Sequence, residues 1–529
     1  MTSKMVDPFT LEVISNALFG MAEEISLTVM RAARSPLLRE AGDLSSAMTD
    51  HHGLLISQGR DIPMHMGVMC FTVQEFLKRV PAEKLQPGDV WFLNLPEVGG
   101  NHLPDVKAIR PIFIEGRLLS FAVSLAHWAD IGGAVAGSYV PFARDAWTEG
   151  LRISPLRVGT SAGIDREKLD IILSNVRGAP EREGDILAQI AATLVAERRF
   201  KSLCDAHGAE LVRNAISQLH DISEARMRQA ISAIPDGVYT GEDFLDDNAA
   251  GGDPVAIRVR VMIEGDKATF DFTDTADSVP GPINTTPFIA AASVYYVIRA
   301  LFGSDIPPNG GCFRSIHVRT RPGSVLNPGF DKPVVGGNHE TSQRVADAIF
   351  RAFERLYPEK LTAGGPTTSG LLLFAGKHED GRWTTLYETH GGGEGARIDR
   401  DGMPALRVHM SNVMNTPAEV IEAEYPLQIA YQRLRSGSGG AGRHRGGEGQ
   451  HRAYRVTGDA VSLTTMFERA VVPPYGLEGG EPGKLFTVEV IPADSQPYKL
   501  SGKTNVTLKR GDIVVVKSCG GGGYGKSEP

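Results

Sequence analysis

The sequence predicts a mixed α/β (α+β) protein of several lobes, and three observations support this fold class. The chain has 529 residues, more than the roughly 100–200 residues of a single domain. Apolar residues recur at helical spacing in some segments and alternate as in strands in others. The 60 glycines cluster toward the C-terminal half, which predicts tight turns and close backbone approach there.

Changes of pattern along the chain indicate where one lobe gives way to the next. We expect an N-terminal α/β lobe with a hairpin and a metal site over residues 1–164, and a helical segment over 165–235. A central α/β lobe with glycine-rich loops should follow over 236–435, and a β-rich C-terminal lobe over 436–529. Pro235-Asp236-Gly237 marks the middle boundary as a turn.

Composition argues against several classes of protein. Hydrophobic content of 42% and charged content of 22% are those of an ordinary globular chain, and a net charge of −8 argues against nucleic-acid binding. Four well-separated cysteines without a C-x-x-C pair suggest neither a disulfide framework nor a zinc knuckle, which fits the cytoplasm. We see no signal peptide and no run of 18 apolar residues, so we expect no membrane segment.

The first predicted element is an amphipathic helix. Asp7-Pro8 combines a capping side chain with proline at the first helical position. Apolar residues then recur at three-and-four spacing, and the helix should end before Pro36. We assign this apolar stripe a packing role.

Further along the N-terminal lobe, two apolar runs around a glycine predict a β-hairpin. The runs are Val106–Ile114 and Leu118–Leu125, joined by Glu115-Gly116-Arg117. Antiparallel pairing about Gly116 places two residues opposite each other when their numbers add to about 232.

Asp105 and His127 satisfy that sum, so the open end of the hairpin should bring a carboxylate and an imidazole together. His102, three residues before Asp105, can fold back over the same point. Two imidazoles and a carboxylate suit a divalent metal with positions left open for water or substrate. The alternative is a buried His–Asp hydrogen bond with His102 on a surface loop, and the residues alone leave both open.

Three other residues have both a structural and a functional interpretation. Asp43 lies between a helix and a probable strand, where it is either a turn residue or the acid that completes a metal site. His65, close to Pro63, is either structural or catalytic. Asp130 precedes Ile131-Gly132-Gly133 and is either a turn carboxylate or a group that orients a ligand or moves a proton.

The remaining regular elements follow in sequence order. Their patterns predict helices over 183–203, 210–234, 286–302 and 343–355, and strands over 90–95, 255–263 and 268–272.

Two glycine-rich motifs stand beside these elements. Gly337 and Asn338 precede a helix, where backbone amides favour an anion or a carbonyl oxygen. Gly392 and Gly393 follow His390 in the second motif. We take the glycines and Asn338 as candidate substrate-binding residues and His390 as a candidate proton carrier; turn geometry alone is the alternative.

A third motif imitates a nucleotide site. Gly520 to Ser527 satisfies the phosphate-loop pattern G-x-x-x-x-G-K-[ST]. That loop works because a helix follows it, and only Glu528 and Pro529 follow here. We therefore reject ATP binding at this motif.

Eight segments in this order make the chain similar to the hydantoinase B/oxoprolinase family, from about Asp7 to the C-terminus. They are DPFTLEVI (7–14), GDLSSAM (42–48), NHLPDV (101–106), AHWADIGG (126–133), GGNHETSQRVAD (336–347), ETHGGGEGAR (388–397), NTPAEVIE (415–422) and GGGGYG (520–525).

The resemblance implies a metal site and a partner subunit. His102, Asp105 and His127 match the family's ligand pattern, and Asp43 matches an acidic ligand of lactam-hydrolysing members. Zinc is the expected ion, with manganese or iron as alternatives. The partner would be a hydantoinase A-type ATPase subunit of actin-like fold, in a hetero-oligomer, which phosphorylates the substrate with ATP.

The leading functional hypothesis is an ATP-dependent hydrolase of a cyclic amide such as a hydantoin, 5-oxoproline or another lactam. In it a metal-activated water attacks the phosphorylated carbonyl, with Asp130, His65 or His390 moving protons. The alternatives are a subunit of a ketone carboxylase, of the acetone or acetophenone type, and a non-catalytic scaffold for the ATPase subunit.

Overall fold

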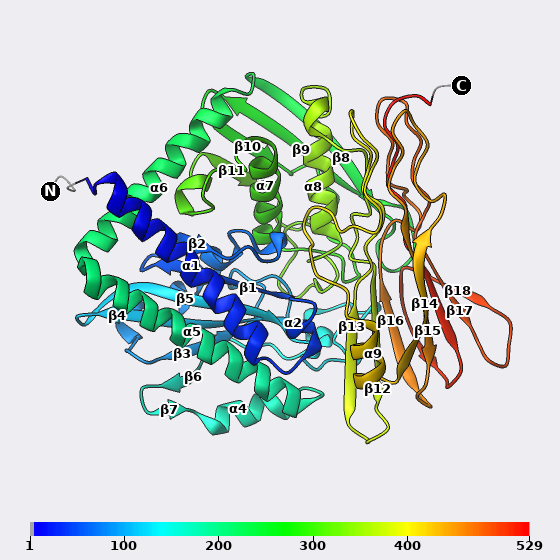
Figure 1. The fold of residues 1–529 in the computed structure, drawn as a ribbon, viewed down its shortest axis with the longest axis horizontal. Helices are drawn as coiled ribbons and strands as arrows, with labels where there is room; N and C mark the ends of the chain where they lie inside the picture. Colours follow the sequence, from blue (N-terminus) through cyan, green and yellow to red (C-terminus); the bar gives the residue numbers. More distant parts are fainter. Residues whose placement is uncertain (1–4, 528–529) are drawn as a thin grey trace.

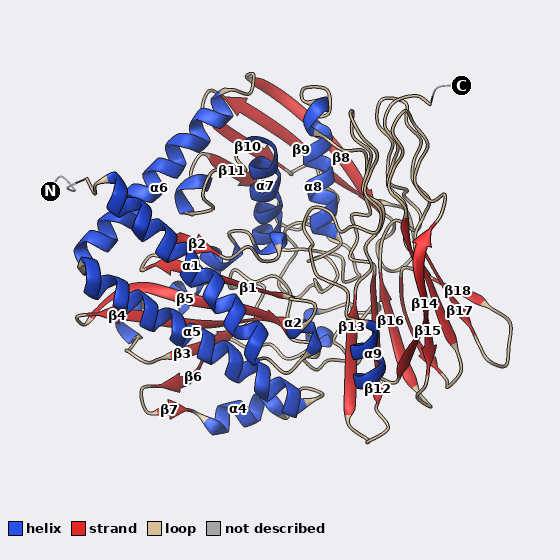
Figure 2. Ribbon diagram, viewed as in Figure 1, coloured by secondary structure: helices blue, strands red, loops and turns tan. Residues whose placement is uncertain are grey.

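The computed structural model describes residues 5–527 and confirms the mixed α/β class. Within this range the chain forms four β-sheets. In Figure 1 the N-terminal part (blue to cyan) lies at the lower left, the middle part (green) above it, and the C-terminal part (yellow to red) at the right. Helices gather on the N-terminal and middle parts, whereas the C-terminal part consists of strands and long loops with the short helix α9 (Ala418–Glu424) (Figure 2).

The N-terminal part is a seven-stranded sheet in the order β2-β1-β5-β4-β3-β6-β7. Its strands are β1 (Leu44–Asp50), β2 (Leu55–Gln58), β3 (Val90–Leu93), β4 (Asp105–Ile114), β5 (Arg117–His127), β6 (Leu156–Thr160) and β7 (Gly163–Ile164). The helices α1 (Pro8–Ala32) and α5 (Ala179–His207) run side by side over one face (Figure 1). The short helices α2 (Pro36–Arg39) and α4 (Arg166–Leu173) flank them, and α3 (Val68–Arg79) packs from the opposite side.

Helix α1 packs through the predicted stripe. Asp7 accepts a hydrogen bond from Thr10 N at 3.0 Å, as its place before Pro8 predicts. The helix is long and apolar enough to cross a membrane by length and composition alone. Its residues Ile14, Leu18 and Ile25 are nevertheless buried against the sheet and α5, which makes it a core helix.

The hairpin β4–β5 has the predicted register. Asp105 pairs with His127 and Val106 with Ala126, so the partners add to 232. The turn lies at Glu115 and Gly116, both with positive φ, and one register shift follows Ile112. The pairing places Asp105 and His127 at the end of the sheet that faces the rest of the molecule.

The middle part is a four-stranded sheet in the order β11-β10-β9-β8. The strands are β8 (Gly237–Leu245), β9 (Val255–Glu264), β10 (Lys267–Asp271) and β11 (Ile316–Arg319). The helices α6 (Ala209–Ser232), α7 (Pro287–Phe302) and α8 (Thr341–Ala352) pack around it (Figure 1). Helix α8 begins two residues before the predicted start and ends three residues before the predicted end, because helix boundaries depend on capping contacts more than on periodicity.

The C-terminal part contains the other two sheets. One has the order β13-β12-β16-β19 and the other β14-β15-β20-β17-β18. Their strands are β12 (Leu371–Lys377), β13 (Trp383–Glu388), β14 (Leu427–Arg435), β15 (Gly449–Val456), β16 (Val461–Met466), β17 (Thr487–Ile491), β18 (Tyr498–Leu500), β19 (Lys503–Leu508) and β20 (Ile513–Lys517). Helix α9 (Ala418–Glu424) precedes β14.

Extended glycine-rich segments stack backbone to backbone beside these sheets. Gly440 N donates to Gly521 O at 2.8 Å, Gly521 N to Gly447 O at 3.0 Å, and Gly447 N to Glu394 O at 2.8 Å. A Cβ on Gly446 would lie 1.9 Å from Gly521 O, so only glycine allows this spacing. The glycines of the phosphate-loop pattern are part of this stack, and no helix follows them as far as residue 527.

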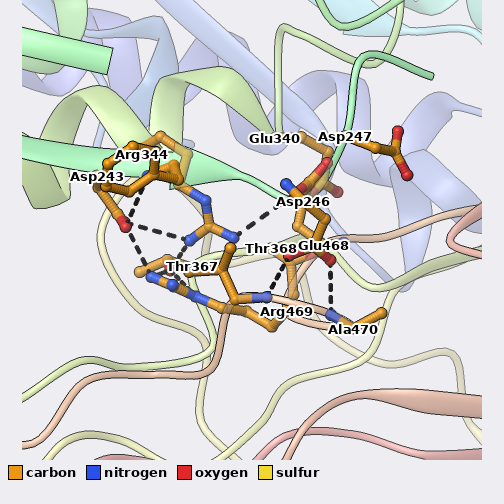
Figure 3. A network of polar contacts seen from close by, with 12 residues as sticks. Asp243, Asp246, Asp247, Glu340, Arg344, Thr367, Thr368, Glu468, Arg469 and Ala470 are labelled. Carbon is orange, nitrogen blue, oxygen red and sulfur yellow. Dashed lines mark hydrogen bonds and ion pairs between the residues drawn. The ribbon is translucent and has the colours of Figure 1, made fainter. Parts of the chain in front are cut away.

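A buried ionic network joins the middle part to the C-terminal part (Figure 3). Arg469 Nη2 lies 3.1 Å from Asp243 Oδ2 on β8 and 2.7 Å from Asp347 Oδ2 on α8. Arg344 Nη1 on α8 and Arg469 Nη2 each donate a hydrogen bond of 2.6 Å to Thr367 Oγ1. Buried charges are tolerated only when paired, so this network fixes α8 against the C-terminal sheets.

Close packing of α8 on β8 gives a test of the fold. A Cβ on Gly241 would lie 2.0 Å from Ala348 O and 2.6 Å from Ala352 N. We expect Gly241→Ala to lower the free energy of unfolding by about 1–3 kcal/mol or more, because neither backbone can give way. Gly20→Ala is the control: this exposed glycine of α1 has nothing within 4 Å of the added Cβ.

Thermal unfolding followed by circular dichroism measures both variants. Gly20→Ala should unfold at the wild-type temperature or above it, since alanine favours a helix over glycine by about 0.5–1 kcal/mol. Equal midpoints for Gly241→Ala and the wild type would mean that α8 and β8 are not packed this closely.

Candidate metal site

A small enclosed cavity lies at the open end of the hairpin, where the three parts of the chain meet. The N-terminal part contributes Asp43, His65, His102, Asp105 and His127 to its wall. The segment before α8 contributes Asn338 and His339, and the C-terminal half contributes Ser369, Tyr387, Thr389, Ser411 and Val413. Its volume of about 10 Å³ is room for one water molecule or one ion.

The three predicted ligands His102, Asp105 and His127, called the trio below, meet in this cavity. One ligand atom each of His102, Asp105 and His127 lies within 4.8 Å of the other two, and all three residues are at most 2% exposed. Within residues 5–527, His102 Nε2, Asp105 Oδ1 and His127 Nδ1 are buried and make no hydrogen bond, although the first two atoms lie 3.2 Å apart as an ion pair. Buried polar atoms left unpaired on three neighbouring residues are destabilising unless an ion binds them, so the residues present fit a metal.

The ring of His102 is oriented by a contact from the middle part. Its Nδ1 donates to Val335 O at 2.8 Å, which leaves Nε2 directed into the cavity. Val335 N in turn donates to Glu149 Oε1 at 2.8 Å. Burial raises the pKa of Glu149 to about 7, although the amides of Val334 and Val335 oppose this shift. Glu149 thus positions a ligand through one peptide unit, a common arrangement around metal-binding histidines.

The ring of His127 is oriented by a pair of tyrosines. His127 Nε2 lies 3.2 Å from Tyr139 OH, and Tyr139 OH lies 3.3 Å from Tyr387 OH on β13. Burial raises the pKa of both hydroxyl groups, so they remain protonated. When Nε2–H of His127 donates to the Tyr139 oxygen, Nδ1 carries no proton and is available to a ligand.

Asp105 is the negative centre of the site. Its Oδ1 lies 3.2 Å from His102 Nε2, and its Oδ2 lies 3.4 Å from both His65 Nε2 and Asn338 Nδ2. Burial alone would raise the pKa of Asp105, but His102 and His65 outweigh it and hold this pKa well below its usual value. Asp105 is consequently ionised and available to a cation.

Asp43 and His65 line the cavity outside the trio. Burial and the neighbouring Asp105 raise the pKa of Asp43 to about 7. His65 Nδ1 is 2.8 Å from Ser45 Oγ, which directs Nε2 of His65 toward Asp105.

Other predicted site residues lie away from the cavity wall. The two oxygens of Asp130 accept hydrogen bonds from Gly132 N and Gly137 N, both at 2.8 Å, and from Arg177. His390 bonds Gly370 O and Tyr454 OH, both at 2.8 Å, and burial lowers its pKa to about 3.

The predicted substrate-binding glycines are also placed by the structure. Gly337, Gly392 and Gly393 pack closely against other backbone segments, since a Cβ on each would lie between 1.8 and 2.6 Å from a carbonyl oxygen. Asn338, from the same prediction, does line the cavity.

His339 is a wall residue that the sequence analysis did not select. Its Nδ1 donates to Glu340 Oε1 at 3.0 Å, and its buried Nε2 has no partner among the described residues. Glu340 is held by Ser369 N at 3.1 Å. The run N-H-E before a helix was visible in the sequence, but nothing in it indicates that its histidine reaches the hairpin.

Comparison with known proteins agrees with the resemblance of the motifs. The sequence profile described as hydantoinase B/oxoprolinase matches residues 7–527. Caprolactamase subunit beta of Pseudomonas jessenii is 31% identical over 98% of this chain and 91% of its own length. 5-Oxoprolinase 1 of Arabidopsis thaliana is 31% identical over all of this chain, which spans only 42% of that longer protein.

Two solved structures share the fold. The crystal structure of ATP-dependent caprolactamase from Pseudomonas jessenii has a TM-score of 0.92 at 29% identity, over 99% of this chain and 92% of the other. A nucleotide-free structure of acetone carboxylase has a TM-score of 0.90 over 98% of this chain and 76% of the other. At 18% identity, this second likeness concerns the fold alone.

The trio gives a direct test of metal binding. We expect His102→Ala to weaken binding of zinc to the purified chain by more than about 100-fold, because loss of even an orienting partner of a ligand weakens binding 10- to 100-fold. Elemental analysis after dialysis measures the effect. His52→Ala, at an exposed position, is the control and should keep the wild-type content. A folded His102→Ala protein with stoichiometric metal would exclude His102 as a ligand.

Proposed function

The chain belongs to the hydantoinase B/oxoprolinase family, and on that basis we propose that it is the metal-dependent subunit of an ATP-dependent enzyme that hydrolyses a cyclic amide. The observation that supports this proposal best is the set of three unpartnered ligand atoms in the enclosed cavity. The relatives named as a caprolactamase subunit and as 5-oxoprolinase support the substrate class.

In this proposal His102, Asp105 and His127 hold the ion, and Asp43, which lines the same cavity, adds a second carboxylate. Two imidazoles and one or two carboxylates suit zinc, and manganese or iron fit the same donors. When bound, such an ion polarises a carbonyl and lowers the pKa of water to roughly 7.

The residues around the ion position the reacting groups. Asn338 donates to Asp105 and keeps a free side-chain oxygen, Oδ1, for a substrate N–H or for water. His339 presents an unpartnered Nε2, because Glu340 accepts from its other nitrogen. His65 is the predicted proton-transfer residue that we retain, since it faces the cavity, whereas Asp130 and His390 do not line it. The cavity is too small to hold bulk water around the reacting groups.

A partner subunit supplies activation of the substrate. Resonance makes an amide a poor electrophile, and a phosphoryl group on its oxygen makes the carbon more electrophilic. Water then adds to that carbon, the ring C–N bond breaks to give an acyl phosphate, and a second water cleaves the acyl phosphate to the carboxylate and phosphate. Relatives are named as subunits, which implies a partner. We propose that this partner is a hydantoinase A-type ATPase of actin-like fold, which binds ATP, and that the two form a cytoplasmic hetero-oligomer.

The test is reconstitution of the chain with the candidate ATPase subunit. We expect ATP-dependent ring opening of 5-oxoproline, caprolactam or a hydantoin, abolished by a chelator and restored by zinc or manganese. Mass spectrometry of the product in ¹⁸O-water should show one incorporated oxygen atom in the new carboxylate when the acyl phosphate is cleaved at phosphorus, and two when it is cleaved at carbon.

Two other results would contradict this proposal. Product formation from a ketone that requires bicarbonate would assign the chain to the carboxylases. Full ATP-dependent activity after the metal is removed would leave the chain as a scaffold.

A further inference from the structure

Arg407 contacts two residues of the cavity wall and is itself partly exposed. The guanidinium donates to Thr389 Oγ1 through Nη2 and to Ser369 O at 3.4 Å through Nη1. Thr389 and Ser369 both line the cavity and are at most 3% exposed, whereas Arg407 is partly exposed. Arg407 therefore connects the cavity wall to the surface.

Arg407 differs from the fully buried arginines in having no counter-ion. Carboxylates pair with Arg182, Arg344, Arg452 and Arg469. Within residues 5–527, no carboxylate oxygen lies within 4.0 Å of the guanidinium of Arg407. The carboxylate with the strongest influence on it, Glu388, already binds Arg452, Asn415 and Thr416.

The surroundings of Arg407 disfavour its positive charge. Arg407 is partly buried, and this burial lowers its pKa to about 10. Its two contacts use two of the five N–H donors of an arginine, which leaves three for a ligand. The planar donor array of arginine matches the oxygens of phosphate and carboxylate groups.

The size of the cavity determines which part of a substrate meets Arg407. A volume of about 10 Å³ admits an ion or a single small group but not a phosphoryl group. With the reacting carbonyl directed at His102, Asp105 and His127, a bulky anionic substituent has to remain on the solvent side. Arg407 is the partly exposed charged residue that contacts the wall there, through Thr389.

We propose that Arg407, together with Thr389, forms an oxyanion subsite at the mouth of the cavity, which binds the anionic group of the substrate. Its ligand is a phosphoryl or a carboxylate group, and the choice of a phosphoryl group rests on the proposed function. Binding of such a group supplies the counter-charge that Arg407 lacks and places the rest of the substrate over the cavity.

The test uses the purified full chain and inorganic phosphate as the probe, titrated calorimetrically. We expect Arg407→Gln to weaken phosphate binding about 10- to 100-fold, the effect of losing charge-assisted hydrogen bonds, and Arg407→Lys to give an intermediate loss. Arg400→Gln is the matched control, because Arg400 is exposed in the same connection between β13 and α9. Circular dichroism establishes that each variant is folded.

Further arms of this experiment separate the ligands and the sites. His102→Ala should still bind phosphate, since the subsite does not need the metal. Acetate that competes weakly assigns the subsite to phosphoryl groups, and acetate that competes equally assigns it to carboxylates.

Three results would overturn the proposal. They are unchanged phosphate binding in Arg407→Gln, loss of phosphate binding in His102→Ala, and no phosphate binding by the wild type. The experiment requires neither the ATPase subunit nor a substrate. Failure of lactam hydrolysis in the reconstituted enzyme would therefore contradict the proposed function but not the subsite.

Discussion

The pairing of Asp105 with His127 across one hairpin is the constraint on which the site depends. A register shift of one residue would turn one of the two side chains to the opposite face of the sheet. The pairing places a carboxylate and an imidazole on rigid neighbouring strands, and the turn before Asp105 adds His102. Rigid strands hold ligands more precisely than loops do, which favours a preorganised site.

The hairpin alone leaves the site incomplete, because the contacts that orient its ligands come from other parts of the chain. His102 is fixed through Val335 and Glu149, and His127 through Tyr139 and Tyr387. The ionic network around Arg344 and Arg469 fixes α8 against the C-terminal sheets (Figure 3). Helix α8 begins next to Asn338 and His339, so packing of the lobes and geometry of the cavity are coupled.

The sequence predicts those features that depend on nearby residues. The hairpin, its register and the trio within 26 residues follow from turn chemistry and alternation, and the helices follow from periodicity. Contacts over long separations were not predictable: His102 and Val335 are 233 residues apart, and Tyr139 and Tyr387 are 248 apart. No local pattern indicates that such segments meet, so His339, Glu149 and Arg407 were found only in three dimensions. The glycines of the C-terminal half were predicted to allow close backbone approach, and many of them form a stack of extended segments.

The central claim is that one cation occupies the space between His102, Asp105 and His127. Anomalous X-ray diffraction at the zinc edge, on crystals of the chain grown with zinc, tests it most directly. The account predicts one strong peak about 2.0–2.2 Å from His102 Nε2, Asp105 Oδ1 and His127 Nδ1. A cavity without a peak, or a peak bound by other residues while these three side chains point apart, would contradict it.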